Sequence, residues 1–352
     1  MAKTKIRIKD IAEQAGVSVG TVDRVLHNRG DVAEETKMKI LEIAKVNNYQ
    51  PNLIARALIS KKECVFTALL PTPTEEDIFW EKPLSGINDA ALELEQFHVK
   101  VEKFFFEHYN EQDFVKQTED ILKLEPSGVV FPPIFKKESL EFIQKLDKKG
   151  IPYIFLESKI KESNYLAYVG SDGYHSGRVA ANVVDHSIPK DGDILIVNLA
   201  KNLENVHHLN KRTQGFLSYF MDHGRNSGLK INLEIPSSKS KLIQEKLNSV
   251  LEKNNNIKAI FTTGSKVYKI AEYLIKYNID NIVLVGFDPI KKNVEYLNLG
   301  KINYLIGQHP YQQGFKSIKK LFEHVMLRNE ITRDEILPVD IINRESIKLY
   351  HT

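Results

Sequence analysis

The sequence predicts an α/β protein in which a small all-helical unit precedes two doubly wound parallel α/β lobes, and three observations support this prediction. The chain has 352 residues, more than one hydrophobic core usually fills. Residues 1–62 contain 12 Lys and Arg against 7 Asp and Glu, whereas the remaining 290 residues together carry a net charge of −2. Beyond residue 62, apolar strand-like segments alternate with amphipathic helix-like segments, a pattern typical of parallel sheets covered by helices on both faces.

Composition excludes several classes of protein. Hydrophobic residues make up 42% of the chain and charged residues 27%, close to the globular average, so a disordered or collagen-like chain is not expected. Cys64 is the only cysteine and no Cys/His set has zinc-finger spacing, so we expect neither a disulfide nor a metal site. The absence of a signal-peptide core and of any uncharged apolar run of about 18 residues favours a cytoplasmic protein without membrane contact.

Residues 8–48 predict three short helices with a sharp first corner. The apolar residues of the first helix recur at helical spacing: Ile8, Ile11, Ala12 and Ala15. Gly16 then tolerates the positive φ of a tight corner, and Ser18 can cap a second helix. The inward face of that helix carries Val22, Val25 and Leu26, and a third helix is expected at about 34–48. This arrangement is a helix-turn-helix, whose second helix can enter the DNA major groove; a solvated charged face is the alternative explanation of the basic charge.

Another short helix is expected directly after the third. Pro51 cannot continue the third helix, and Asn52 can cap a new one over residues 53–59. The alternative is a solvated linker helix in which Leu58 packs against the main body.

The front of the chain resembles the headpiece of LacI-family repressors. The resemblance covers residues 7 to about 60 and rests on IKDIAEQAGVS at 8–18, TVDRVL at 21–26, NYQPN at 48–52 and ARAL at 55–58. It implies a helix at 53–59 that folds on the operator, with one leucine wedged between base pairs of the minor groove. The DNA-binding residues that it implies are Ser18, Val19, Gly20, Thr21, Asp23, Arg24, Asn28, Tyr49, Asn52, Ala55, Arg56 and Leu58.

Three positions of the second helix leave the operator sequence open. Thr21 and Arg24 can reach phosphates and base edges, but Val19 and Gly20, which take the family's base-reading positions, are poor hydrogen-bonding residues. Asp23 stands where the family usually carries serine. An anion facing DNA costs affinity unless it accepts from a cytosine amine or pairs with a neighbouring arginine.

The large unit supplies seven expected strands, at 65–70, 99–106, 129–131, 153–156, 194–199, 259–262 and 282–287. Helices are expected between them at 84–96, 111–124, 138–148, 175–186, 266–278 and 310–328. Ligands in such folds bind beyond the carboxyl ends of the strands. Those strand ends and one helix supply a candidate set of polar and aromatic residues: Phe79, Trp80, Asp172, Arg212, Asp288 and Gln308.

Carboxylates, one arginine, one glutamine and an aromatic pair suit a sugar, because they bind hydroxyls and stack on C–H faces. Their order over roughly 63–345 resembles the type I periplasmic-binding-protein-like effector domain that follows the LacI headpiece, which implies that all six residues contact the ligand. Structural alternatives remain open: Asp172 could cap the following helix, Asp288 could form a turn before Pro289, and Arg212 could pair with either carboxylate.

The predicted domains are a headpiece at 1–49, a hinge helix or linker at 50–62, and an effector-binding and dimerisation domain at 63–352. Lobe one is expected at about 63–167 and 309–331, and lobe two at about 168–308 and 332–352, with chain crossings near 168, 308 and 332. The tail after residue 344 has no heptad repeat, which favours a homodimer over a coiled-coil tetramer.

No nucleophile elbow, phosphate-binding loop or dinucleotide fingerprint occurs, so we expect neither an enzyme nor a cofactor. The alternatives are a sugar-acting enzyme with Asp172 and Asp288 as its acid and base, and a nucleoid-type DNA protein. The resemblance implies a transcriptional repressor whose partners are double-stranded operator DNA, a second copy of the chain and a small sugar or sugar derivative. A purine is the second ligand candidate, and a sugar acid would need a further cation such as Lys201 or Lys211. The sequence does not predict which ligand binds or whether it releases or strengthens DNA binding.

Overall fold

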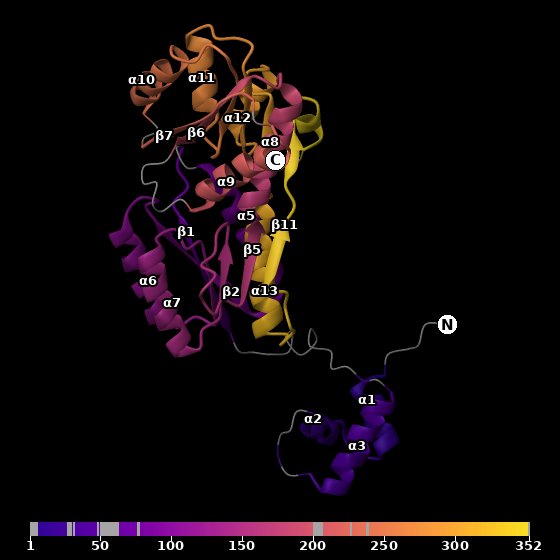
Figure 1. Cartoon of the computed structure of the whole chain (residues 1–352). Helices are drawn as coiled ribbons and strands as arrows, with labels where there is room; N and C mark the ends of the chain where they lie inside the picture. The colour runs from indigo at the N-terminus through magenta and orange to yellow at the C-terminus, as the bar shows by residue number, and fades with distance from the viewer. Residues whose placement is uncertain are drawn as a thin grey trace. The chain divides into compact units, whose positions relative to one another are not determined.

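The computed structural model describes residues 6–26, 30, 32–47, 49, 63–75, 78–199, 207–225, 227–236 and 239–350. The chain forms two compact units, residues 1–59 and 60–352 (Figure 1). The expected hinge helix at 53–59 and the expected boundary between headpiece and linker lie outside the described residues.

The small unit contains the three helices α1 (Ile8–Ala15), α2 (Val19–Leu26) and α3 (Glu34–Val46). The fully buried residues of its core are Ile11, Val22 and Ile40. Gly16 ends α1 at φ 73°, in the left-handed region that glycine adopts without strain. Ser18 Oγ accepts a hydrogen bond from the backbone N–H of Thr21 at 3.1 Å and so caps α2. The helix-turn-helix predicted for this segment is confirmed.

Lobe one of the large unit is a six-stranded sheet with the order β11-β5-β4-β3-β1-β2, in which all pairs are parallel. Its strands are β1 (Cys64–Pro71), β2 (Val99–Phe106), β3 (Gly128–Phe131), β4 (Tyr153–Leu156), β5 (Ala167–Ser171) and β11 (Asp334–Leu337). Its helices are α5 (Glu81–Leu94), α6 (Glu111–Leu124), α7 (Lys136–Lys149) and α13 (Pro310–Val325), with short 3-10 helices at Ile78–Trp80 and Glu95–Phe97. Figure 1 shows α6 and α7 on one face of the sheet and α5 and α13 on the other.

Lobe two is a second six-stranded sheet, with the order β12-β10-β9-β8-β6-β7. Its strands are β6 (Asp193–Leu199), β7 (Lys230–Ile235), β8 (Ile257–Thr262), β9 (Val283–Phe287), β10 (Tyr304–Gly307) and β12 (Asp340–Ile342), and only the β10–β12 pair is antiparallel among the described pairs. Its helices are α8 (Gly173–Ser187), α9 (His207–Asp222), α10 (Ser240–Leu251), α11 (Tyr268–Lys276) and α12 (Lys291–Asn298), followed by a 3-10 helix at Ser346–Leu349.

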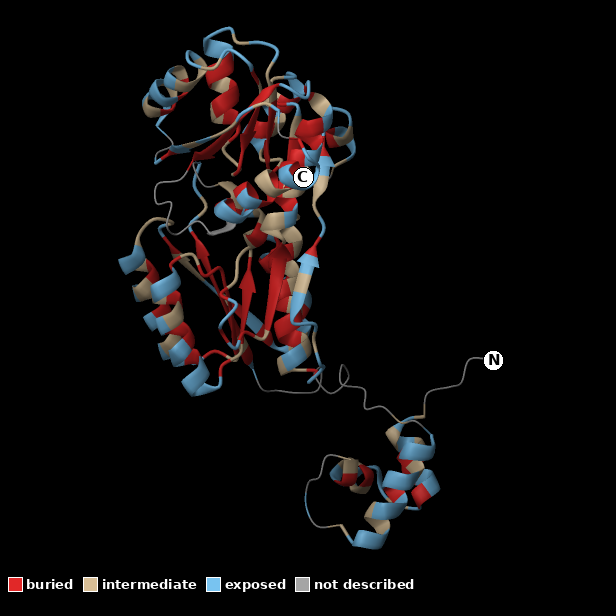
Figure 2. Cartoon of the chain, viewed as in Figure 1, coloured by how far each residue is buried: buried red, intermediate tan, exposed pale blue. Residues whose placement is uncertain are grey.

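Both faces of each sheet are buried, as parallel sheets require. Helices α8 and α9 contribute to one core of lobe two, and α10, α11 and α12 contribute to another. Figure 2 shows the buried residues gathered in the strands and the exposed ones on the outer faces of the helices. The predicted class, two doubly wound parallel α/β lobes behind a helical headpiece, is confirmed.

The chain crosses between the lobes three times, after β5, between β10 and α13, and between β11 and β12. The crossing expected near 308 is where the structure has it. The crossings expected near 168 and 332 were placed too early, because β5 and β11 both belong to the sheet of lobe one: Ala167 pairs with Ile154, and Asp334 pairs with Tyr168. Lobe one therefore includes residues up to 171 and again up to 337.

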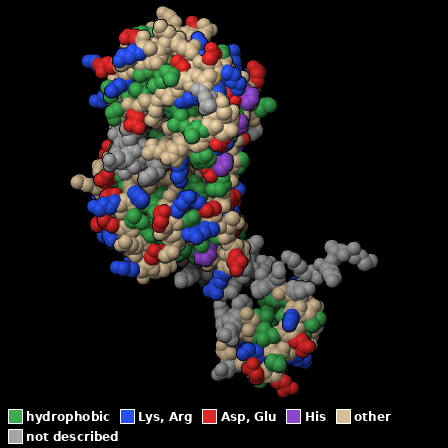
Figure 3. Space-filling model, in the orientation of Figure 1, with side chains coloured by type: hydrophobic (Ala, Val, Ile, Leu, Met, Phe, Trp, Pro, Cys, Tyr) green, Lys and Arg blue, Asp and Glu red, His purple; other side chains and the backbone are tan. Residues whose placement is uncertain are grey.

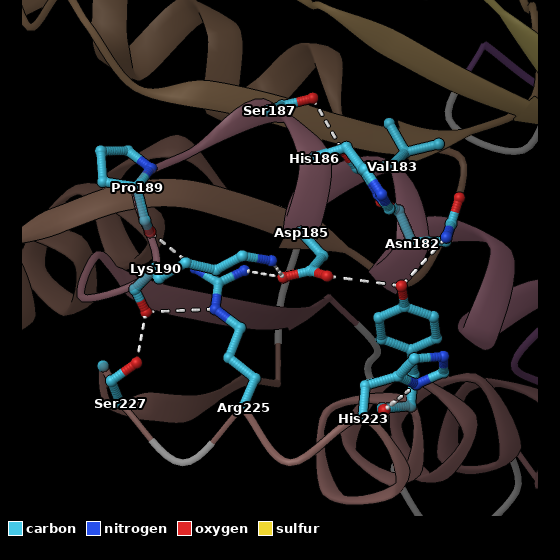
Figure 4. Close-up of polar contacts among 12 residues, drawn as sticks. Asn182, Val183, Asp185, His186, Ser187, Pro189, Lys190, His223, Arg225 and Ser227 are labelled. Atoms are coloured by element: carbon cyan, nitrogen blue, oxygen red, sulfur yellow. Dashed lines mark hydrogen bonds and ion pairs between the residues drawn. The ribbon is translucent and has the colours of Figure 1, made fainter.

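A buried ion pair joins the ends of α8 and α9 in lobe two (Figure 4). Asp185 accepts hydrogen bonds from Arg225 Nη1 and from Lys190 Nζ, and Arg225 Nη2 donates to the carbonyl of Pro189 at 2.7 Å. The side chains of Asp185 and Arg225 are only 7% and 4% exposed. Burial raises the pKa of Asp185, but the hydrogen bonds from Lys190 and Arg225 outweigh it and hold that pKa below its ordinary value.

Candidate functional site

A cavity of about 420 Å³ lies between the two lobes, within the size range of small-molecule sites. Lobe one lines it with Phe79, Trp80, His108, Tyr109, Pro133, Ile134, Lys136 and residues 157–162. Lobe two lines it with Leu199, Leu209, Lys211, Arg212, Gly264, Ser265, Lys266, Asp288 and Gln308. Five of the six predicted ligand-binding residues therefore meet at one cavity, although they come from four separate parts of the chain.

Three of these residues form a buried hydrogen-bonded chain, which we call the cavity floor: Arg212, Gln308 and Asp288. Arg212 Nη2 donates to Gln308 Oε1, and Gln308 Nε2 donates to both carboxylate oxygens of Asp288, at 2.9 and 3.1 Å. Each of the three residues is at most 3% exposed. The amide oxygen of Gln308 thus accepts from the arginine cation, and its amide nitrogen donates to the aspartate anion.

The position of Arg212 depends on the close packing of α8 against α9. A Cβ on Gly177 would lie 2.0 Å from the carbonyl oxygen of Arg212, and a Cβ on Gly215 would lie 1.8 Å from that of Tyr174. Glycine at these two positions therefore allows the helix backbones to approach. Arg212 then lies 3.9 Å from the centre of the Phe287 ring, and its Nη1 donates to the carbonyl of Thr263 at 2.7 Å.

Burial and charge act in opposite directions on the cavity floor. Burial raises the pKa of Asp288 to about 6, against the effects of Arg212 and of the hydrogen bonds from Gln308. Burial also lowers the pKa of Arg212, while Glu157 and Asp288 raise it. Glu157 Oε1 is 4.0 Å from Arg212 Nη2. The arginine charge is therefore balanced by two carboxyl groups before any ligand binds.

Three non-glycine residues at the ends of strands adopt left-handed backbone conformations: Glu157 at φ 66°, Asp288 at φ 63° and His309 at φ 55°. Such conformations typically cost about 1–3 kcal/mol each and gather at functional sites. At Asp288 the turn is stabilised by Asn293, whose Nδ2 donates to the carbonyls of Phe287 and Asp288 at 3.0 and 2.8 Å.

Aromatic rings form the wall of the cavity on the side of lobe one. Phe79 and Trp80 meet edge to face with their ring centres 5.2 Å apart, and Trp80 meets His108 edge to face at 6.2 Å. Tyr109 stacks on His108 at 4.6 Å. Trp80 is largely buried and Phe79 is half-buried, so Phe79 offers the larger accessible ring face.

Asp172 has a different environment from the other five predicted ligand-binding residues. It is not among the cavity-lining residues, and its Oδ1 accepts a hydrogen bond from the backbone N–H of His175 at 3.0 Å at the start of α8. The structure thus gives Asp172 the capping role that the sequence left open as an alternative.

Some lining residues are absent from the predicted ligand set. Glu157 follows β4 in the same way that Asp288 follows β9, so the strand-end rule that found Asp288 could have found it. His108 and Tyr109 follow β2 within three residues and carry the same signal. Lys136 and Lys161 are exposed lysines, and an exposed lysine in a sequence has no pattern that separates it from the rest of the surface.

On the headpiece, α2 presents several of the predicted DNA-binding residues to solvent. Ser18, Gly20 and Arg24 are exposed, and Val19 is 48% exposed. Arg24 Nε donates to the carbonyl of Gly20 at 3.3 Å. Burial raises the pKa of Tyr49, and the negative charge of Asp23 raises it further. Asp23 and Tyr49 therefore lie near one another. Thr21 is half-buried, and five further predicted DNA-binding residues lie outside the described part of the chain: Asn28, Asn52, Ala55, Arg56 and Leu58.

A helix-turn-helix unit joined in one chain to a two-lobed α/β unit with a cavity defines a ligand-responsive DNA-binding regulator. Residues 7–52 match the family of bacterial regulatory proteins of the lacI type, and residues 67–328 match the periplasmic binding protein domain. The chain belongs to the LacI family of transcriptional regulators.

Relatives and solved structures agree with this assignment. The ribose operon repressor of Lactococcus lactis subsp. lactis (strain IL1403) is 26% identical over 351 residues, covering 97% of this chain and 98% of that protein. The HTH-type transcriptional regulator RegA of Clostridium saccharobutylicum is 24% identical over 350 residues, covering 96% and 98%. These relatives are regulators and not enzymes.

A structure from Bacteroides fragilis, described as a LacI transcriptional regulator, has a TM-score of 0.74 and 29% identity, covering 82% of this chain and all of that one. The glucose-galactose binding protein GanP of Geobacillus stearothermophilus has a TM-score of 0.72 at 20% identity, covering 81% and 99%, and shows the fold alone. Among the described residues, no helix is both long and apolar enough to span a bilayer, and no group of three His, Cys, Asp or Glu side chains could hold a metal ion.

Proposed function

We propose that this regulator is a repressor controlled by a small sugar or sugar derivative that binds between the lobes. The observation that carries the proposal is the buried chain of Arg212, Gln308 and Asp288 at the floor of a 420 Å³ cavity. Such a chain offers fixed donors and acceptors to hydroxyl groups. In addition, Arg212 Nε is buried and has no hydrogen-bond partner among the described residues, so it has a donor to offer to a ligand oxygen.

Five residues carry ligand binding in this proposal. Arg212, Asp288 and Gln308 bind hydroxyls, and Phe79 and Trp80 stack on the C–H face of the ring. Asp172 is left out because it caps α8. The name of one similar protein, the ribose operon repressor of Lactococcus lactis, supports a sugar over a purine.

The proposed regulator acts as a homodimer in the cytoplasm and binds a near-palindromic operator, because two-fold protein symmetry matches two half-sites. The ligand controls DNA binding by preferring one arrangement of the lobes. Ser171, at the first crossing between the lobes, donates its hydroxyl to Gln308 Oε1 at 3.0 Å, and Gln308 lies at the second crossing. The cavity floor is therefore hydrogen-bonded to the segments that must change when the lobes move.

The only tryptophan, Trp80, lines the cavity and provides a test. Its fluorescence should change saturably when the full chain is titrated with one class among sugars, sugar derivatives and purines. Asp288→Asn should abolish the change, whereas Asp280→Asn, which alters an exposed carboxylate paired with Lys301, should not. Saturable binding of a purine alone, or a titration that Asp288→Asn leaves unchanged, would overturn the proposal.

A further inference from the structure

The two ends of the cavity differ in charge balance. The cavity floor holds one cation, Arg212, opposite the carboxyl groups of Glu157 and Asp288. All three side chains are buried or nearly so. The floor therefore has no unbalanced positive charge with which to attract an anion, and it suits neutral hydroxyls.

The mouth of the cavity has a different composition. Three exposed lysines, which we call the rim lysines, line it: Lys136, Lys161 and Lys211. None of them forms an ion pair or a hydrogen bond with any described residue. Among the described residues, Glu162 is the only exposed acidic residue that lines the same cavity, so the described part of the rim carries an excess of positive charge.

The other two lysines of the cavity wall are already engaged. Lys159 Nζ is 2.6 Å from Asp334 Oδ2 and lies 4.7 Å from the centre of the Tyr168 ring, and Lys266 also has an interaction partner. Some lysines elsewhere on this unit have acidic partners, such as Lys301 with Asp280 and Lys319 with Glu93. Figure 3 accordingly shows Lys and Arg interspersed with Asp and Glu over the visible face of the large unit.

The rim lysines come from both lobes. Lys136 begins α7 and Lys161 follows β4, both in lobe one, whereas Lys211 lies on α9 in lobe two. Because like charges across a cleft repel one another, these lysines oppose closure when no anion is present. A ligand with a negative group at the mouth would remove that repulsion and bridge the lobes.

We propose that the effector is an anionic sugar derivative, whose polyol part binds the cavity floor and whose carboxylate or phosphate binds the rim lysines. This inference rests on the proposed function, since it assumes a sugar-type ligand in the same cavity. Beyond that function, the inference specifies the charge of the ligand and its orientation in the cavity, with the anionic group toward solvent. Flexible lysines suit such a group because each presents a compact charge on a long stem.

The test compares matched neutral and anionic probes on the full chain by calorimetry and Trp80 fluorescence. The probes are D-glucose, D-glucuronate and D-glucose 6-phosphate, together with D-ribose and D-ribose 5-phosphate, each at 50 and 300 mM NaCl. We expect an anionic probe to bind at least tenfold more tightly than its neutral parent, with the advantage shrinking at high salt because exposed charges are screened. The two kinds of anionic probe then distinguish a sugar acid from a sugar phosphate.

Two triple variants make the result specific. K136Q/K161Q/K211Q should reduce the preference for the anion about tenfold while leaving affinity for the neutral parent within about twofold. K137Q/K145Q/K291Q removes the same charge from exposed lysines that do not line the cavity, and it should leave the preference unchanged.

The outcomes separate the two proposals. Binding of a neutral sugar as tight as that of its anionic derivative, together with loss of binding in Asp288→Asn, would overturn the anionic ligand and keep the sugar-binding function. An anion preference that both triple variants reduce equally would also overturn the rim site. Failure of every probe to bind, or binding that Asp288→Asn does not alter, would overturn both proposals.

Discussion

At the residue scale, the ligand-binding proposal depends on a few side chains whose roles follow from burial. Gln308 can serve both neighbours only because its amide accepts from Arg212 and donates to Asp288, an orientation that neither glutamate nor leucine could reproduce. The sequence predicted Asp288 and Gln308 from the rule that polar groups collect at the ends of parallel strands, and it predicted Arg212 from a helix. The same rule also selected Asp172, which caps α8. The rule cannot separate the two roles, because a carboxylate after a strand can either bind a ligand or cap the next helix.

The raised pKa of Asp288 predicts a pH effect on stability. Its pKa is about 6 in the folded protein, above the unfolded value of about 3.9. The group therefore stabilises the fold fully below about pH 4, and this contribution is lost as the pH rises through 6. Relative to Asp288→Asn, the wild type should gain about 2 kcal/mol in free energy of unfolding between pH 7.5 and pH 4. Urea denaturation at several pH values measures this difference, and parallel profiles of the two proteins would contradict it.

At the element scale, the individually predicted strands all occur, with ends within two residues of expectation. Strand β7 was not predicted, although Lys230, Asn232 and Glu234 alternate with apolar residues as in a half-buried strand at the edge of a sheet. The crossings near 168 and 332 were misplaced for another reason. A strand's own residues show that it is buried but not which sheet it joins, and that depends on partners far away in the chain.

Close packing of α8 against α9 leads to a second prediction. Gly215→Ala places a methyl group 1.8 Å from the carbonyl oxygen of Tyr174, so the helices must separate. We expect a loss of about 1–3 kcal/mol in free energy of unfolding, by analogy with overpacked cores, and weaker effector binding because Arg212 shifts. Gln214→Ala, at the exposed neighbouring position, is the control for denaturation and ligand titration. Equal stability and affinity in the two variants would show that the glycine is not required.

The buried ion pair of Asp185 and Arg225 leads to a third prediction, on stability. Asp185→Asn leaves the Arg225 charge buried without its carboxylate, and we expect a cost of about 3–5 kcal/mol. Asp222→Asn removes the partner of Arg178, where the carboxylate is 58% exposed, and should cost less than about 1 kcal/mol. Chemical denaturation of both variants measures these costs, and a loss in Asp185→Asn no larger than that in Asp222→Asn would refute the buried network as a stabilising feature.

At the scale of the whole molecule, the regulator combines a DNA-reading helix with a cavity whose floor is hydrogen-bonded to two crossings between the lobes. The sequence could predict this combination because each unit has its own pattern: three short helices with a sharp corner in the small unit, and alternating strands and helices in the large one. It could not predict the rim lysines as a group, because Lys136, Lys161 and Lys211 meet only when the two lobes are assembled. What unites the proposals is one claim, that a ligand at this cavity changes the affinity for DNA.

The measurement that tests this claim most directly is the affinity of the full chain for DNA, with and without a saturating effector. The DNA is a duplex selected from random sequence by the protein itself, and binding is followed by fluorescence anisotropy. The effector should change the dissociation constant at least fivefold in the wild type, in line with usual coupling between sites, and should leave it unchanged in Asp288→Asn. An equal dissociation constant with and without an effector that demonstrably binds the wild type would contradict the account.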